Sequence, residues 1–229
     1  MTPEGASNAP FDLIGRLAIQ EVRITDDLAH IEVFTMQGLL TLLWHGDRDA
    51  ERVVVMLGGA MGGLLGPSDG AYHDLGVAFA AQGIGTIRVG YRRANDLPEC
   101  VLDAAAACDL AARAGAERFV AVGHSFGGAV AVGVGIALPT HINGVVTLAT
   151  QSAGCESAEL LYPRPLLLLH GERDEILPVM CSEVVAGLAG GGELVVLPGA
   201  GHLLNTAGAG DAVREKLLSW IPPVLAGAA

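Results

Sequence analysis

Two kinds of apolar pattern divide the chain. Residues 17–24 and 31–43 carry strand-like apolar content on either side of the turn-prone segment Thr25-Asp26-Asp27. This pattern predicts two opening strands that form a hairpin. From Arg52 onward, continuous apolar runs alternate with helical runs. Such alternation is typical of right-handed βαβ crossovers around a mostly parallel sheet.

The alternating part of the chain predicts a definite series of elements. Strands are expected at 53–57, 84–89, 119–122, 142–149, 165–170 and 193–197. Helices are expected at 72–81, 101–114, 126–138, 181–188 and 212–220. The predicted fold is therefore α/β, with helices on both faces of a mostly parallel sheet and an antiparallel hairpin at its start. No repeat or linker interrupts the series, so residues 1–229 are expected to form one domain, with 1–12 as a disordered arm.

The composition agrees with a buried parallel sheet. Hydrophobic residues make up 51% of the chain and charged residues 17%, a balance that excludes general disorder. Aromatic residues make up only 4%, whereas glycine occurs 32 times. The core is therefore expected to consist of Val, Leu, Ile and Ala, as in sheets covered on both faces.

The charge and the chain ends narrow the class of protein further. A formal net charge of −12 disfavours nucleic acid and anionic membrane surfaces as partners. The N-terminus lacks the pattern of a secretory signal, and residues 128–138 are too short and too glycine-rich to span a bilayer. We therefore expect a cytoplasmic protein without membrane partners, and nothing in the sequence indicates an oligomeric state.

The arginines near residue 90 and the cysteines are expected to be surface and packing residues, respectively. Arg88, Arg92 and Arg93 are expected to be solvated at a loop entrance, where they could contact an acidic substrate group. The cysteines have no Cys-x-x-Cys spacing, which fits reduced packing thiols rather than disulfides or a zinc site. They are Cys100, Cys108, Cys155 and Cys181.

The strongest chemical signal is Gly123-His124-Ser125-Phe126-Gly127, between a predicted strand and a predicted helix. This is the Gly-x-Ser-x-Gly pattern of a nucleophile elbow. A strand that turns sharply into a helix strains its central residue and leaves room only for small residues two positions away. The start of the helix also places Ser125 where a developing negative charge is stabilised.

Two further motifs follow the last predicted strands. His170-Gly171-Glu172-Arg173-Asp174 closes one strand and Gly199-Ala200-Gly201-His202 closes the final one. Parallel sheets place their sites at these carboxyl ends. We interpret Ser125 as the nucleophile, His202 as the general base and Asp174 as the acid that orients the base, because this chain order matches a hydrolase triad.

Rival residues exist for the base and the acid. We expect His124 to pack or to line the pocket wall, because its side chain should leave the elbow in another direction than that of Ser125. The other rivals to His202 are His170, His30, His45, His73 and His141. The rivals to Asp174 are Glu172, Glu175 and Glu156.

On these three motifs the sequence resembles the α/β-hydrolase superfamily from about Leu17 to Trp220. The absence of a long insertion is similar to small, lidless esterases and to dienelactone-hydrolase-like members. Dienelactone hydrolases proper carry cysteine at the elbow, and haloalkane dehalogenases and epoxide hydrolases carry aspartate, whereas this chain has Ser125. The resemblance therefore implies acyl transfer to water from a small-molecule ester or thioester, with no cofactor and no metal.

The resemblance also implies an oxyanion hole. One donor would be the amide of Phe126, and the second an amide of the loop 58–63, with Ala60 favoured and Met61 as the runner-up. Gly58 stands where related proteins often have the histidine that braces this loop. Met61, Leu64, His124 and Leu203 are candidate substrate contacts. An acyltransferase, a cofactor-free haloperoxidase and a non-catalytic binding protein stay open as alternatives.

Overall fold

A nine-stranded sheet organises the computed structural model, which describes residues 8–206 and 208–227. The strand order is β1-β2-β3-β5-β4-β6-β7-β8-β9. Strands β1 to β3 run antiparallel and β3 pairs antiparallel with β5, whereas the pairs from β5 through β4 to β9 are parallel. The strands are β1 (Arg16–Thr25), β2 (Leu28–Thr35), β3 (Gly38–His45), β4 (Arg52–Leu57), β5 (Gly85–Gly90), β6 (Arg118–His124), β7 (Ile142–Leu148), β8 (Leu166–Gly171) and β9 (Glu193–Leu197).

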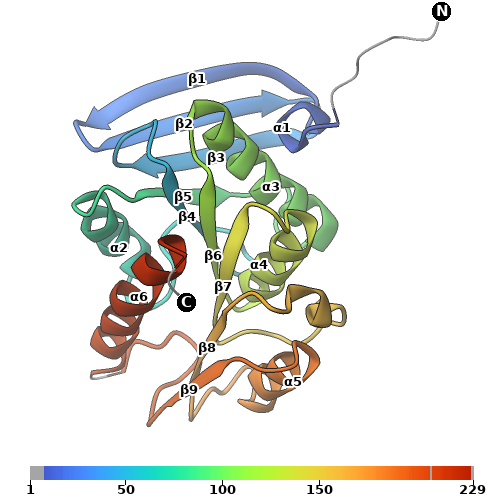
Figure 1. Cartoon of the computed structure of the whole chain (residues 1–229), viewed down its shortest axis with the longest axis vertical. Coiled ribbons are helices and arrows are strands. Elements are labelled where there is room, and N and C mark those ends of the chain that lie inside the picture. Colours follow the sequence, from blue (N-terminus) through green and yellow to red (C-terminus); the bar gives the residue numbers. More distant parts are fainter. Residues whose placement is uncertain (1–7, 207, 228–229) are drawn as a thin grey trace, which may run out of the picture.

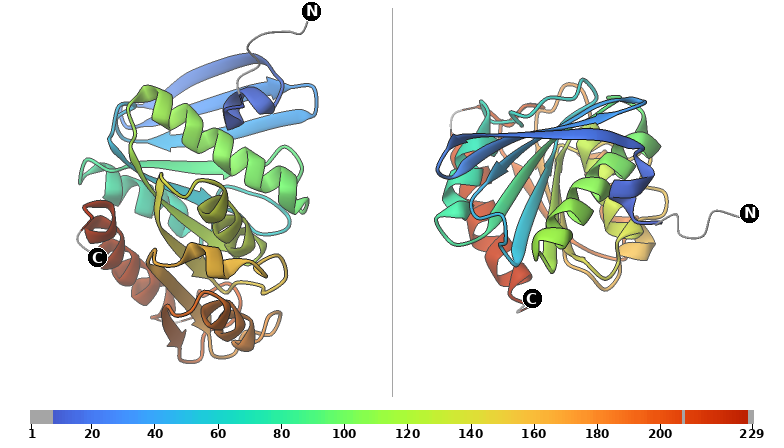
Figure 2. Two further views of the ribbon diagram at one scale, coloured as in Figure 1. Left: turned by 45° about the vertical axis from the view of Figure 1, so that its right-hand side comes forward. Right: turned by 90° about the horizontal axis from the view of Figure 1, so that it is seen from above.

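Helices cover both faces of the sheet, as the sequence predicts (Figure 1). Helices α1, α3, α4 and α5 lie on one side, and α2 and α6 on the other, which is clearest from above (Figure 2). Each face buries its own apolar cluster, so the central strands are covered twice. The helices are α1 (Pro10–Leu13), α2 (Ala71–Ala80), α3 (Leu97–Ala114), α4 (Phe126–Ala137), the 3-10 helix η1 (Ala158–Leu161), α5 (Met180–Leu188) and α6 (Ala209–Leu225).

The chain opens with the predicted antiparallel hairpin, β1 and β2, and a third strand extends it. Strands β2 and β3 replace the single strand expected at 31–43, so the opening is a three-stranded meander. The turn between them is held by Thr35, whose hydroxyl donates to the carbonyl of Gly38 and accepts from the amide of Gln37. Gly38 has a φ of 136°, which favours glycine. Apolar residues continue on both sides of this turn, and therefore the hydrophobic pattern does not mark it.

The last residues of the predicted N-terminal arm are helical. Residues 1–7 lie outside the described residues, but Pro10–Leu13 form helix α1, which packs on α3. Phe11 is 1% exposed, and its amide donates to Asp109. One buried aromatic residue thus anchors a segment whose composition resembles that of a flexible arm.

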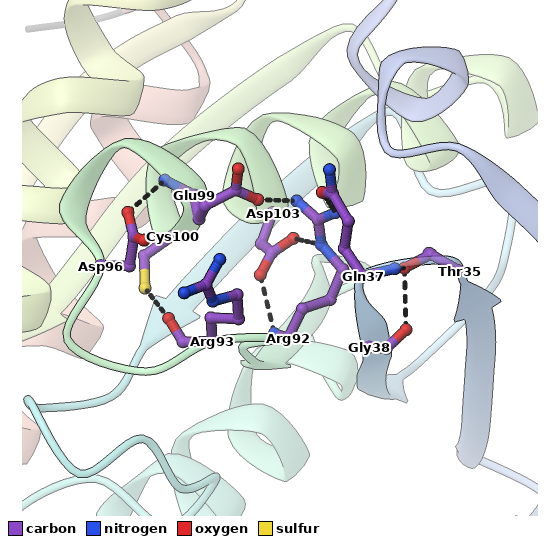
Figure 3. A network of polar contacts seen from close by, with 9 residues as sticks. All are labelled: Thr35, Gln37, Gly38, Arg92, Arg93, Asp96, Glu99, Cys100 and Asp103. Carbon is purple, nitrogen blue, oxygen red and sulfur yellow. Dashed lines mark hydrogen bonds and ion pairs between the residues drawn. The ribbon is translucent and has the colours of Figure 1, made fainter.

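The prediction that the three arginines near the end of β5 are solvated is wrong for two of them. Arg88 and Arg92 are buried, and only Arg93 is exposed. Arg92 pairs with Asp103 and Glu99 of α3 and donates to the side chain of Gln37, so it ties β5, α3 and the β2–β3 turn together (Figure 3). A buried guanidinium needs such partners because it cannot lose its charge.

Three other expectations concern the last helix, the cysteines and membrane-spanning segments. The helix expected at 212–220 is longer in the structure, Ala209–Leu225, with Pro222 and Pro223 near its end. All four cysteines are free thiols, as predicted. Within residues 8–206 and 208–227, no helix has both the length and the apolar character needed to cross a membrane.

Candidate active site

Ser125 occupies the sharp turn between β6 and α4. Its φ and ψ are 57° and −119°, a backbone conformation that is strained for a residue with a side chain. A Cβ on Gly123 would lie 1.8 Å from the carbonyl oxygen of Gly127. A Cβ on Gly127 would lie 2.5 Å from the carbonyl oxygens of Leu57 and Gly58. Both glycines of the motif are therefore required by close backbone contacts, and the elbow has the predicted geometry.

Asp174 and His202 are joined by a hydrogen bond, although 28 positions separate them in the sequence. Asp174 lies in the loop after β8, and His202 in the loop after β9. Nδ1 of His202 is 2.8 Å from Oδ2 of Asp174, and both side chains are buried. Glu175 accepts the amide of His202, which connects the two loops a second time.

The acid is held as a carboxylate by several donors. Burial by itself raises the pKa of Asp174, but hydrogen bonds from the amides of Leu177 and Ile176 and from His202 outweigh burial, and the net pKa lies below its usual value. A carboxylate can only accept, so Nδ1 of His202 carries a hydrogen. In the neutral imidazole, Nε2 is then left as the basic nitrogen.

Ser125 and His202 line one cavity of about 560 Å³, but no hydrogen bond joins their side chains in the described part of the chain. Free hydrolases often have a long serine–histidine contact that shortens with substrate bound. The structure thus brings Asp174 and His202 into contact, and Ser125 lines the same cavity as His202.

The wall of this cavity is largely apolar. Met61, His124 and Leu203 line it, in agreement with the prediction. Leu64 does not line it: its side chain lies 3.5 Å from where a Cβ on Gly90 would be, and its carbonyl accepts from Arg88. Leu65 and Ile176 take part in the wall instead.

The loop 58–63 closes the cavity opposite the elbow. A Cβ on Gly59 would lie 3.8 Å from Cβ of Ser125, which shows how near the loop backbone comes. The amide of Gly62 donates to the carbonyl of Gly59, so Ala60 and Met61 form the corner of a tight turn. Ala60 packs on the core, whereas Met61 is 95% exposed.

Two tyrosines brace this loop where its usual histidine is replaced by Gly58. The hydroxyl of Tyr72 donates to the carbonyl of Leu57 at 3.0 Å, and that of Tyr91 donates to the carbonyl of Gly58 at 3.1 Å. The ring of Tyr91 also packs edge-on against Phe126, 6.4 Å between centroids. Tyr91 therefore contacts both segments that the sequence assigns to the oxyanion hole.

Removing the Tyr91 hydroxyl is expected to loosen the loop. We expect Tyr91→Phe to lower the free energy of unfolding by about 1 kcal/mol, because the carbonyl of Gly58 loses its hydrogen-bond donor. Urea unfolding compared with Tyr162→Phe, at a position that is 75% exposed, provides the measurement and its control. An unchanged free energy of unfolding in Tyr91→Phe would show that the loop does not depend on this hydroxyl.

His170 also contacts Asp174 but does not line the cavity, and the remaining rival residues have other partners or lie elsewhere. Nε2 of His124 lies 3.0 Å from the carbonyl oxygen of His202, and the two rings are 4.9 Å apart. Glu172 accepts the amide of Gly199, and the other rival carboxylates likewise accept backbone amides rather than an imidazole N–H. His30, His45, His73 and His141 do not line the cavity.

His124 couples the stability of the protein to pH. Burial, together with the charges of His202 and His170, lowers the pKa of His124 to about 4. A histidine is protonated in the unfolded chain below about 6.5, so the unfolded state binds more protons between these two values. The contribution of neutral His124 to the free energy of unfolding is complete above pH 6.5 and is lost as the pH falls toward 4.

We expect buried His124 to lower the free energy of unfolding of the protein by about 2 kcal/mol at pH 5 relative to pH 7.5. Urea unfolding at the two values, compared between wild type and His124→Gln, measures that part of the change. Asp174 does not contribute in this window, because a lowered carboxyl pKa stabilises the fold down to more acidic pH. Equal pH dependence in the two proteins would contradict the assignment.

Metal ligation has little support at this site. Within residues 8–206 and 208–227, no group of three or more His, Cys, Asp or Glu residues is arranged to hold a metal ion. The site instead combines a serine hydroxyl at the start of α4 with a histidine that is hydrogen-bonded to a buried carboxylate.

Sequence reasoning missed several residues near the site. The contacts of Tyr72 and Tyr91 with loop carbonyls have no local sequence signal, because they depend on the packing of α2 and β5 against β4. Ile176 follows Asp174 closely and could have been found from its place in the acid turn.

Comparisons with known proteins support the fold. No model of a protein family matches the sequence, and no curated protein matches it either. Among solved structures, Est1E from Butyrivibrio proteoclasticus aligns with a TM-score of 0.71 at 14% identity, covering 86% of this chain and 99% of that one. A dienelactone hydrolase from Anabaena variabilis aligns with a TM-score of 0.72 at 17% identity, covering 88% and 96%.

A third structure agrees with these two. An alpha-beta serine hydrolase homologue from Coxiella burnetii aligns with a TM-score of 0.67 at 18% identity, covering 86% of this chain and 98% of that one. The chain therefore has the α/β-hydrolase fold, as its motifs predict.

Proposed function

We propose that this protein is a serine hydrolase that cleaves a carboxylic ester or thioester through an acyl-enzyme on Ser125. The observation that carries the proposal is the hydrogen bond between Asp174 and His202 in the same cavity as the strained Ser125. The names of the structural neighbours include an esterase-type protein, a dienelactone hydrolase and a serine hydrolase homologue, which supports hydrolysis as the class of reaction.

The proposed reaction has two balanced steps. Oγ of Ser125 attacks the carbonyl carbon while Nε2 of His202 takes its proton, and the leaving alcohol or thiol then receives that proton. Water next attacks the acyl-enzyme with the same base, which releases the acid and restores the serine. Asp174 stabilises the imidazolium in both steps. The amides of Phe126 and Ala60, with Met61 as the alternative for the second, bind the oxyanion.

Active-site labelling tests this proposal directly. A fluorophosphonate probe should modify the folded wild-type protein once, at Ser125, as read by intact mass and peptide mapping. Ser125→Ala and heat-unfolded wild type are the controls, and neither should be labelled. Folded wild type that resists the probe would overturn the proposal.

The cavity also supports a class of substrate. Among the residues that the structure describes, its lining contains no Lys, Arg, Asp or Glu side chain, and its titratable members are His124 and His202. The acyl group is therefore proposed to be small and uncharged. The formal net charge of −12 adds to this preference, since it repels anionic esters.

We expect p-nitrophenyl butyrate to be hydrolysed with a kcat/KM at least about tenfold above that of mono-p-nitrophenyl succinate, which carries a carboxylate into an uncharged pocket. Leu65→Arg should reduce this preference, because Leu65 lies on the cavity wall and is 68% exposed. Equal rates for the two esters in wild type would refute the substrate class without touching the triad.

A further inference from the structure

The carboxylate of Asp174 has two histidine partners, of which the proposed reaction uses one. Oδ2 lies 2.8 Å from Nδ1 of His202 and also 3.2 Å from Nε2 of His170. Oδ1 accepts the amides of Ile176 at 2.9 Å and Leu177 at 2.8 Å. Each carboxylate oxygen therefore has two neighbours, and the group is fixed in both position and rotation.

The contacts of His170 determine where its hydrogen lies. Nε2 makes its hydrogen bond to the carbonyl oxygen of Leu177 at 2.9 Å, and Oδ2 of Asp174 lies 3.2 Å from the same nitrogen; both oxygens can only accept. Nε2 must therefore carry a hydrogen. Nδ1 lies 2.7 Å from the hydroxyl of Ser182, which donates to it in the neutral ring.

His170 is entirely enclosed and stands apart from the cavity. Its side chain and that of Asp174 are 0% exposed, and Ser182 of α5 is buried behind it. His170 comes from the end of β8, which brings it within reach of the acid four positions later. It does not line the cavity, so a substrate would not touch it.

We propose that His170 is a positioning residue for the acid: its Nε2–H, with Ser182 fixing the ring from the other side, holds Oδ2 of Asp174 toward Nδ1 of His202. This proposal rests on the proposed hydrolase function. The chain Ser182–His170–Asp174–His202 then crosses from α5 to the cavity through four buried side chains.

The shared oxygen predicts an electrostatic effect as well as an orienting one. The N–H of His170 stabilises the negative charge on Oδ2, so that charge supports the His202 imidazolium less strongly than an unshared carboxylate would. Without His170 the acid attracts the proton of His202 more strongly. His202 then stays protonated to higher pH, so the neutral form that takes the serine proton predominates only at a higher pH than in wild type.

Two substitutions separate positioning from packing. His170→Phe removes both ring nitrogens at similar size, whereas His170→Gln can place an amide N–H near the position of Nε2. We expect His170→Phe to lower kcat at least about tenfold with KM within about twofold, and to move the acid limb of the pH profile up by about half a unit. His170→Gln should recover most of kcat. His141→Gln, in an exposed turn, is the matched control.

Other titratable groups face His202 and are unchanged in these variants. His124 lies 4.9 Å away between ring centroids, and Glu175 accepts the backbone amide of His202. A purely structural His170 would lower the unfolding free energy of both variants but leave kcat and the acid limb of the folded protein unaltered. That result would overturn the proposal.

Nuclear magnetic resonance decides the question without turnover. In wild type with 15N-labelled histidine, the neutral ring of His170 should carry its hydrogen on Nε2, and hydrogen on Nδ1 would overturn the proposal even if His170→Phe fails to fold. The titration midpoint of His202 should rise in His170→Phe. If wild type hydrolyses no ester and resists the fluorophosphonate probe, the proposed function fails, whereas these two spectra still test the contact of His170 with the acid.

Discussion

Ser125→Ala is expected to lower kcat for a p-nitrophenyl ester by at least about 10⁴-fold, since Ser125 is the one hydroxyl or thiol side chain among the described residues that line the cavity. The protein should stay folded, because the serine hydroxyl makes no hydrogen bond in the described part of the chain. Ser157→Ala, at an exposed position before η1, is the matched control and should retain full activity.

The same position should reveal the cost of the strained backbone. Ser125→Gly removes the clash that φ 57° and ψ −119° impose on a side chain. We expect its free energy of unfolding to be about 1 kcal/mol higher than that of Ser125→Ala. Urea unfolding of the two inactive variants measures the difference. A glycine variant less stable than the alanine variant would show that this turn stores no strain.

The main features of the fold were predictable because they are local. Each parallel strand is a continuous apolar run, and helix ends are marked by residues such as Gly115. The turn between β2 and β3 was not predictable, because Met36 continues the apolar pattern and Gln37 and Gly38 interrupt it too briefly. Helix α1 was missed for a similar reason: burial of Phe11 against α3 outweighs the polar composition around it.

In the candidate site and near it, too, some residues could be predicted from the local sequence and others could not. Ser125, Asp174 and His202 could be proposed from the sequence because each belongs to a recognisable motif that follows a strand. Arg92 was placed wrongly because its partner, Asp103, lies in the middle of an alanine-rich helix, where nothing marks a buried carboxylate. Leu64 was preferred to Leu65 because the direction of a loop side chain depends on backbone angles that glycine-rich sequence leaves open.

Asp174→Asn should have the second largest effect on catalysis, with kcat lowered by about 10³- to 10⁴-fold. An asparagine can keep the amides of Ile176 and Leu177 as donors to its oxygen, so the loop should stay in place. Its nitrogen then occupies the position of Oδ2 and donates, whereas Nδ1 of His202 needs an acceptor there.

His202 is expected to respond by exchanging its tautomer in Asp174→Asn. With the hydrogen moved to Nε2, the ring presents a donor to Ser125 and cannot take the serine proton until the tautomer changes. Because deprotonating the histidine at high pH does not restore the acceptor, the loss should persist across the pH range. Glu172→Gln is the matched control, since Glu172 accepts only the amide of Gly199 among the described residues. Near-normal kcat in Asp174→Asn would show that another carboxylate orients His202, and Glu175, which already binds its backbone amide, would be the first to substitute.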